Sequence, residues 1–160
     1  MFETQLDATY AWFGLALVSV AVVGVVAALP AAPPPDADAV AYTIDSVADN
    51  EYVATAEHGI VADRMRLTTR TVALASRGET ASATLRGAPI TPVPPDTPGV
   101  HPGLRRVLDG APPGAAFDGP DAFAAAAKRA QASDHGWTAA PDRLTVRQVH
   151  YGEHRVTIVG

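Results

Sequence analysis

Apolar residues form one long uninterrupted run near the start of the chain. Thr9–Leu29 contains 21 residues and no charge. As a helix rising about 1.5 Å per residue it is about 31 Å long, close to the roughly 30 Å of a bilayer's hydrocarbon core. Its early aromatic residues are of the type that favours the membrane–water boundary, and Pro30 ends it. We predict a transmembrane helix over residues 9–29, with these membrane-anchor residues: Tyr10, Trp12, Phe13, Leu15, Leu17, Val22, Val25 and Leu29.

Two other interpretations of the apolar run are less favourable. A cleaved signal peptide has a basic start, a shorter apolar core and a small-residue cleavage site, whereas the preceding MFETQLD is acidic and prolines flank Ala31-Ala32. A helix buried in a soluble core usually carries a polar stripe, and this run has little beyond Ser19. The anchor therefore remains the preferred interpretation, preceded by a short tail over residues 1–8.

A proline-rich spacer over residues 30–39 separates this run from a head domain over residues 40–160. Its sequence, PAAPPPDADA, favours an extended, semi-rigid chain. Asp36 is a suitable N-cap, and apolar residues then recur at helical spacing, which predicts an amphipathic helix over residues 37–49. The apolar positions of that helix are Val40, Ile44, Val47 and Ala48.

Extended segments follow. Residues 52–60 and Met65–Ser76 have strand composition, and the chain turns at Arg77-Gly78-Glu79 before a further strand, Thr80–Arg86. Residues 87–103 contain six prolines and are predicted as loop. The last pair of strands, Arg143–Tyr151 and His154–Val159, flanks Gly152-Glu153, where glycine comes first as a type II′ turn requires.

Two more helices complete the predicted head. A short helix includes Leu104, Val107 and Leu108 and ends at Gly110. A longer helix begins at Pro120 and reaches about residue 133, with Phe123, Ala126, Ala127 and Ala130 on one face. The expected fold class is α+β, with a mainly antiparallel four-stranded sheet and two or three short helices on one face.

Charge and composition narrow the functional classes. Residues 1–63 carry nine acidic side chains and no Lys or Arg, and the net charge of the whole chain is -5. A nucleic-acid-binding protein would present a basic field, so no nucleic-acid partner is expected. The chain has no cysteine, which excludes disulfides, thiol catalysis and cysteine-ligated metals. Because neither end of the apolar run is flanked by Lys or Arg, the positive-inside rule does not orient it.

Candidate chemistry is sparse. His150 and His154 straddle the predicted turn, where Tyr151 opposes His154 and His150 opposes Arg155, so their rings point to opposite faces and do not share a metal. Glu57-His58 lies in an extended stretch without a second carboxylate at a useful spacing. Arg105-Arg106 is interpreted as the solvated side of its helix in preference to a phosphate or lipid site. We therefore expect no catalytic residue, no metal and no cofactor.

Several short segments carry a resemblance that spans most of the chain. They are TYAWFGLAL, LPAAPPPDA, ATAEH, APITPV, LRRVLDGAPP, AFDGPDAF, DRLTVRQV and VTIVG. In these the chain resembles uncharacterised haloarchaeal membrane-anchored proteins associated with type IV or Tad-like pilus and secretion machinery. The resemblance implies a surface role, an extracellular head and no catalytic residues.

The layout of short tail, apolar helix and small β-rich head is also similar to a type IV pilin. Glu3 or Asp7 would correspond to the acidic residue near the start of a pilin helix. The pilin pattern is broken because no Lys or Arg precedes the apolar run as a peptidase site. We therefore expect a non-enzymatic, permanently anchored accessory protein with the lipid bilayer and other proteins as partners. The alternative is a membrane-tethered ligand-binding or sensor module.

Overall fold

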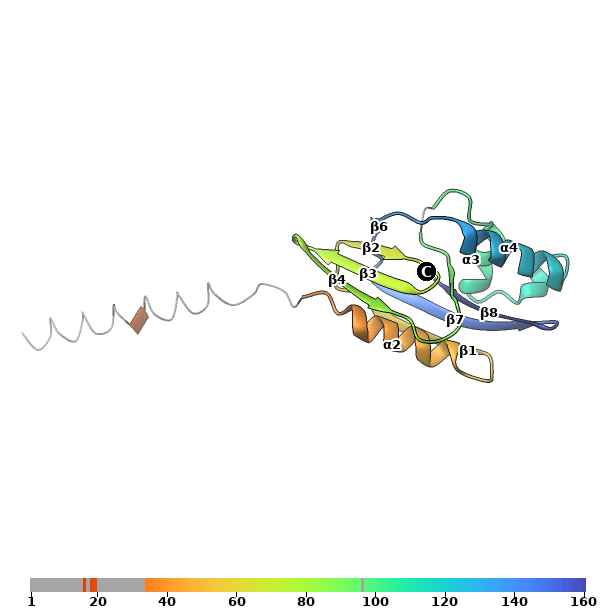
Figure 1. Cartoon of the computed structure of the whole chain (residues 1–160), viewed down its shortest axis with the longest axis horizontal. Coiled ribbons are helices and arrows are strands. Elements are labelled where there is room, and N and C mark those ends of the chain that lie inside the picture. Colours follow the sequence, from red (N-terminus) through yellow and green to blue (C-terminus); the bar gives the residue numbers. More distant parts are fainter. Residues whose placement is uncertain (1–15, 17, 20–33, 96) are drawn as a thin grey trace, which may run out of the picture. The chain divides into compact units, whose positions relative to one another are not determined.

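A computed structural model of the chain describes residues 16, 18, 19, 34–95 and 97–160. Pro34–Gly160 forms a compact unit of its own, drawn in colour in Figure 1. This unit is α+β, with mainly antiparallel sheets and three α-helices in its described part, which confirms the predicted class at this level. The predicted tail and anchor lie outside the described residues except for Ala16, Val18 and Ser19, which are helical.

The three helices begin and end close to where the sequence places them. They are α2 (Ala37–Ala48), α3 (Pro102–Leu108) and α4 (Pro120–Ala132). Asp36 caps α2, since its carboxylate accepts a hydrogen bond of 2.9 Å from the Ala39 N–H. Proline stands at the start of α3 and α4, where its missing N–H has no helical partner to lose. The predicted apolar face of α4 is its buried face.

The strands form two four-stranded sheets. Sheet A has the order β1-β7-β8-β5 and sheet B the order β4-β3-β2-β6. All pairs are antiparallel except β5 with β8. The strands are β1 (Ala54–Gly59), β2 (Arg64–Leu67), β3 (Thr71–Ser76), β4 (Glu79–Thr84), β5 (Thr91–Pro92), β6 (Thr138–Ala139), β7 (Arg143–Tyr151) and β8 (His154–Val159).

The strand count corrects the prediction of a single four-stranded sheet. Met65–Ser76, expected as one strand, is divided into β2 and β3 by a tight turn. The proline-rich segment, expected to be entirely loop, contains the two-residue strand β5. The helices also differ from the prediction, because they cover both faces of sheet A: α2 packs on one side of β7 and β8, and α3 and α4 pack on the other (Figure 1).

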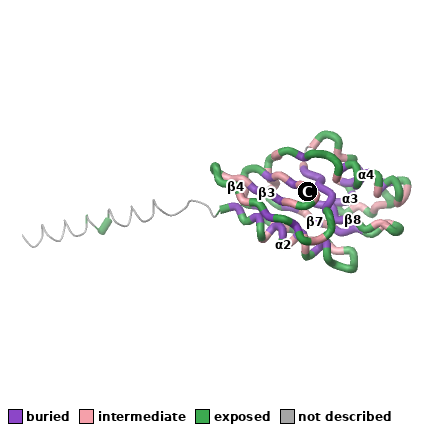
Figure 2. Tube along the Cα trace, viewed as in Figure 1, coloured by how far each residue is buried: buried purple, intermediate pink, exposed green. Residues whose placement is uncertain are grey.

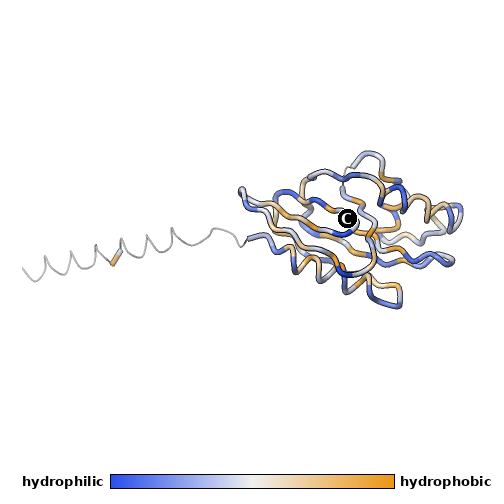
Figure 3. The backbone as a smooth tube through the Cα atoms, in the orientation of Figure 1, coloured by the Kyte–Doolittle hydropathy of each residue, from blue (hydrophilic) through white to orange (hydrophobic). Residues whose placement is uncertain are grey.

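Two hydrophobic cores result from this arrangement. The first lies between α2, sheet B and one face of sheet A, and includes Ile44, Leu74 and Leu144. The second lies between α3, α4 and the opposite face of sheet A, with Phe123 at its centre. Strand alternation explains the division, because neighbouring residues of β8, Ile158 and Val159, enter different cores. In Figures 2 and 3 buried and apolar stretches follow the strands that face the cores, and the alternation is regular in β2 and β3.

Strand β7 holds the ends of two helices through consecutive side chains. Gln148 is fully buried and its Nε2 donates to the carbonyl of Ala48, the last residue of α2, at 3.0 Å. Arg147 points to the other face and donates to the carbonyl of Val107, near the end of α3, at 2.9 Å. Carbonyls in the last turn of a helix lack helical donors, and Gln148 satisfies that of Ala48. The Val107 carbonyl also accepts from the Gly110 N–H at 3.1 Å, so Arg147 adds a second donor there.

Both predicted tight hairpins are present. Tyr151 pairs with His154 across Gly152-Glu153, and Gly152 has φ +60, as the first position of a type II′ turn requires. The turn between β3 and β4 has φ +49 at Arg77 and +89 at Gly78, the pattern of type I′. These turns set the register of the two longest hairpin pairs.

Candidate functional site

The predicted site residues of this chain are those of the membrane anchor. Tyr10, Trp12, Phe13, Leu15, Leu17, Val22, Val25 and Leu29 all lie outside the described residues. Within the part of the chain that the structure describes, no helix combines the length and the apolar character needed to cross a membrane.

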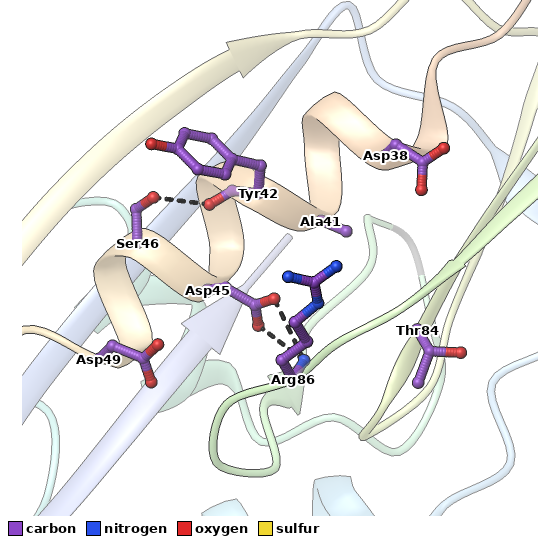
Figure 4. Close-up of a pocket in the computed structure, with 8 residues that line it drawn as sticks. All are labelled: Asp38, Ala41, Tyr42, Asp45, Ser46, Asp49, Thr84 and Arg86. Carbon is purple, nitrogen blue, oxygen red and sulfur yellow. Dashed lines mark hydrogen bonds between the residues drawn. The ribbon is translucent and has the colours of Figure 1, made fainter.

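A surface groove lies between α2 and the outer strand of sheet B, and we call it the α2–β4 groove. Its volume is about 480 Å³. Figure 4 shows Asp38, Asp45 and Asp49 along the helix, with Thr84 and Arg86 on the opposite side. The remaining lining residues are Ala41, Tyr42 and Ser46.

Helical spacing brings the polar lining of this groove together. Asp38, Tyr42, Asp45 and Asp49 follow one another at intervals of three or four residues, so they share one side of α2. The other side of the helix is apolar and buried in the first core. Tyr42 is 76% exposed, which is unusual for an aromatic side chain and leaves its ring free to contact a partner.

The carboxylate of Asp45 joins α2 to the end of β4. It accepts from the backbone N–H of Arg86, with distances of 3.2 and 3.1 Å to its two oxygens, and from the N–H of Gly87 at 3.2 Å. Gly87 lies so close to the helix that an added Cβ would be 2.9 Å from the Oδ1 of Asp49. Two consecutive amides thus hold one carboxylate, while Asp38 and Asp49 remain exposed on the groove wall.

The groove has the chemistry of a recognition surface. It offers carboxylates, one phenol, hydroxyl groups and the guanidinium of Arg86. Such a set can bind a cationic or extended polar segment through hydrogen bonds and charge. Among the residues that line it there is no histidine, cysteine or lysine to act as a base or nucleophile.

A second, smaller hollow of about 330 Å³ lies between α4 and the start of β8. Here the lining is mixed in charge, with Lys128, Arg155 and His154 beside Glu153. The ring of His154 lies 3.4 Å from the carboxylate of Asp121, whose side chain is fully exposed. Water competes for such an exposed contact, so it adds little stability.

The histidines are distributed over separate parts of the head. The register of β7 and β8 is the predicted one, with Tyr151 opposite His154 and His150 opposite Arg155, so these two rings lie on opposite faces. His135 is buried, and its Nε2 bonds to the carbonyl of Ala130 at 2.9 Å. No three metal-ligating side chains gather within the described ranges.

Two further histidines stabilise local structure. His101 is the N-cap of α3, where its Nδ1 accepts from the Gly103 N–H at 3.0 Å, and its ring stacks on Phe117. His58 lies in the extended strand β1, as predicted, with Nδ1 2.9 Å from the hydroxyl of Thr43. That hydroxyl donates to the Ala39 carbonyl at 3.0 Å. Because a hydroxyl has one proton, the Nδ1 of His58 is the donor in this contact when the Thr43 hydroxyl donates to Ala39.

The paired arginines of α3 contact the backbone. Arg105 donates to the carbonyl of Pro94, and Arg106 donates to that of Ala115 at 3.1 Å. Each therefore ties a neighbouring loop to the helix. The sequence interpretation of both as merely solvated residues missed these contacts, because the loops that carry the carbonyls come close only in the folded chain.

The α2–β4 groove was not predicted from the sequence. A signal for it existed, since the polar face of the predicted helix over residues 37–49 carries Asp38, Tyr42, Asp45 and Asp49 at helical spacing. The other wall was hidden, because nothing local indicates that Thr84 and Arg86 lie beside this helix.

Comparison with known proteins matches most of the chain to a family. Residues 3–149 match DUF7283, described as a family of unknown function. No curated protein and no solved structure matches the chain.

Proposed function

We propose that this chain, which belongs to the DUF7283 family, is a non-enzymatic single-pass membrane protein and a structural or accessory component of a surface pilus- or secretion-type assembly. The proposal places the helix over residues 9–29 in the bilayer and the head outside the cell. The family match begins at residue 3, so the anchor segment belongs to the matched region together with most of the head.

The observation that carries this proposal is the uncharged run Thr9–Leu29 next to a compact unit of different character. The head begins at Pro34 and its described cores are built from residues between Ala37 and Val159. A run of that length without charge is costly to expose to water and is stable in hydrocarbon. The proline-rich segment between them then acts as a spacer.

An assembly role is supported by the surface of the head. Tyr42, Tyr52, Val53 and Val61 are large apolar side chains that are each more than half exposed. Aromatic residues are enriched in protein interfaces, where they bury large areas. The resemblance to pilus-associated haloarchaeal proteins supports the same role.

A second candidate function is a membrane-tethered ligand-binding or sensor module, and the α2–β4 groove favours it. A concave surface with convergent polar groups is the expected form of a ligand site. In this alternative the groove binds a small or extended cationic ligand through the carboxylates of Asp38 and Asp49. The third carboxylate, that of Asp45, accepts hydrogen bonds from backbone amides instead.

Protease accessibility on intact cells tests the proposal. Cells that produce the full chain with an epitope in the head are treated with protease, and the membrane fraction is washed with carbonate before detection. We expect the chain to stay in the washed membrane and the head to be cleaved from outside. Protection of the head until lysis would place it in the cytoplasm and would contradict the surface role.

Paired variants show whether the apolar run is the anchor. Leu17→Arg together with Val22→Arg places charges at the centre of the run, which costs about 2.5–3.5 kcal/mol per residue on insertion. We expect this variant to leave the carbonate-washed membrane. The control is Ala132→Arg, a substitution at an exposed position at the end of α4. Equal membrane retention of both variants would contradict the anchor.

Substitution of Tyr42 with alanine separates the two candidate functions. An assembly component loses co-purifying membrane proteins when this exposed ring is removed. A sensor instead keeps its protein partners and changes the affinity for a ligand of the groove, for which spermidine is a suitable cationic probe in calorimetry.

A further inference from the structure

Strand β4 is an outer strand of sheet B, with β3 on one side only. The backbone groups that point away from β3 follow from the register. The Leu85 N–H donates to the Arg70 carbonyl, which continues the β3–β4 ladder. Because bonding alternates along an antiparallel strand, Ala81 and Ala83 bond to β3, and Thr80, Ser82 and Thr84 direct their N–H and C=O groups outward.

Both ends of this outward edge are closed by the chain itself. The next outward amide, that of Arg86, is held by the carboxylate of Asp45. At the other end the hairpin turn Arg77-Gly78 leaves the ladder. Within the described residues β4 has no other strand partner, so the open edge is the short segment from Thr80 to Thr84.

The side chains on this edge do not protect it. Thr80–Thr84 contains no charge and no proline, and all of its side chains are small. Edge strands of soluble proteins usually carry such protecting residues, because an open edge pairs with other strands. One outer strand of sheet A provides a contrast: β1 carries Glu57, which forms a 2.7 Å ion pair with Arg143.

We propose that the β4 edge pairs with the β4 edge of a second copy of this chain. The edge is self-complementary in one antiparallel register, in which Ser82 faces Ser82 of the second copy and Thr80 faces its Thr84. Every outward N–H and C=O then has a partner, because each facing pair exchanges both hydrogen bonds. The result is a sheet that continues from one copy into the other.

Charge complementarity favours a second copy over an unrelated strand. Past the paired segment, this register brings the hairpin turn of the second copy, which contains Arg77, toward Gly87, which is packed against Asp45 and Asp49. Arg77 is exposed and makes no ion pair within the described part of its own chain. The proposed pairing thus directs the Arg77 side chain of each copy toward the acidic wall of the other copy's α2–β4 groove. The proposal does not depend on the membrane anchor, since it uses residues of the head alone.

Cysteine cross-linking tests the register, since the natural chain has no cysteine. Facing residues in a hydrogen-bonded pair have Cα atoms about 5.5 Å apart, within the roughly 4.4–6.8 Å range of disulfides. Full-length Ser82→Cys, oxidised with copper phenanthroline in whichever cell fraction holds the chain, is expected to form a covalent dimer. The matched control is Thr55→Cys on the β1 edge, which is expected to remain monomeric.

A second pair of variants distinguishes this register from accidental contact. Thr80→Cys alone is expected not to cross-link, because the two Thr80 positions lie about 14 Å apart along the strands, four residues at about 3.4 Å each. A mixture of Thr80→Cys and Thr84→Cys chains is expected to form heterodimers. Failure of Ser82→Cys to cross-link above the Thr55→Cys control, or equal cross-linking of Thr80→Cys alone, would overturn the proposal.

Proline at Ser82 gives a disruption test that spares the fold. The Ser82 N–H points outward, so Ser82→Pro removes a bond of the proposed interface and none of the β3–β4 ladder. In the Thr80→Cys and Thr84→Cys mixture we expect this added substitution to abolish the heterodimer. An unchanged heterodimer would overturn the proposal, and an unchanged circular-dichroism spectrum of the proline variant confirms that it is folded.

Discussion

Gly152 lies where the last hairpin meets α4, and its replacement by alanine tests this contact. The residue has φ +60, a conformation that costs an L-residue about 1–2 kcal/mol. An added Cβ would also lie 2.9 Å from the Cβ of Pro120 and 3.0 Å from its Cγ. Both atoms belong to a ring that cannot rotate away, so one of the two backbones has to move. Such overpacking typically costs about 1–3 kcal/mol.

We therefore expect Gly152→Ala to lower the free energy of unfolding by about 2–5 kcal/mol. Two controls separate its causes. Gly78→Ala has φ +89 in an open turn with no atom within 4 Å, so only the backbone term remains and the expected loss is about 1–2 kcal/mol. Gly136→Ala has neither a positive φ nor a neighbour within 4 Å, and its expected effect is within about 1 kcal/mol of zero.

Urea unfolding of the full chain in a mild detergent, followed by circular dichroism, measures these differences. The free energies are compared at equal slope, so that a change in the unfolded state is recognised. A loss of stability for Gly152→Ala no larger than that for Gly78→Ala would contradict the contact with Pro120. That result would mean that Pro120 does not pack against the hairpin, and that α4 is held by other contacts.

Three further predictions concern single side chains of the head, all measured by the same urea unfolding. Phe123→Ala removes a fully buried ring that contacts Phe117 and Tyr151, and we expect it to lower the free energy of unfolding by about 3–5 kcal/mol. Phe123→Leu keeps most of the buried volume, and we expect it to cost less than about 1.5 kcal/mol. Asp45→Ala frees the Arg86 amide and is expected to cost about 1 kcal/mol and speed hydrogen exchange at that amide, whereas Asp49→Ala leaves its exchange unchanged. Gln148→Met removes the hydrogen bond to Ala48 but also the Oε1, which is buried without a partner among the described residues, so we expect the free energy of unfolding to change by less than about 1 kcal/mol. Gln148→Glu places a carboxylate against the Ala48 carbonyl, and we expect it to lower the free energy of unfolding by more than about 3 kcal/mol. Equal losses for the two Gln148 variants would contradict this account of the site.

Local signals in the sequence were sufficient for the helices and for the last hairpin. Asp36 and Pro120 mark helix starts because capping and proline geometry act over a single turn, and the observed starts agree. The turn at Gly152 was identified because a two-residue hairpin requires positive φ there. These features depend on neighbours in sequence, which is why they can be predicted without the tertiary structure.

The division of Met65–Ser76 into two strands could not be predicted in the same way. Its turn has neither glycine nor proline and is made by Thr68, whose hydroxyl bonds to the Thr71 hydroxyl at 2.7 Å and accepts from the Thr71 N–H at 2.9 Å. Threonine is also a common strand residue, so its composition points equally to a continuous strand.

Contacts between distant segments account for the other omissions. Strand β5 exists because Thr91–Pro92 lies parallel to the end of β8, and proline is tolerated there because β5 is an outer strand. The α2–β4 groove was also missed because contacts between distant segments form it. Its helical wall could be read from the spacing of acidic residues, whereas Arg86 comes to the other wall only through the β3–β4 hairpin.

The two helix contacts of β7 have a consequence for how the head reaches its native alignment. Arg147 and Gln148 donate to helices on opposite faces of sheet A. A slip of β7 by one residue would exchange the faces of both side chains, breaking both contacts at once and burying a guanidinium in the first core. Both contacts therefore depend on the same register of β7. Two adjacent side chains thus specify the alignment of this strand relative to both helices.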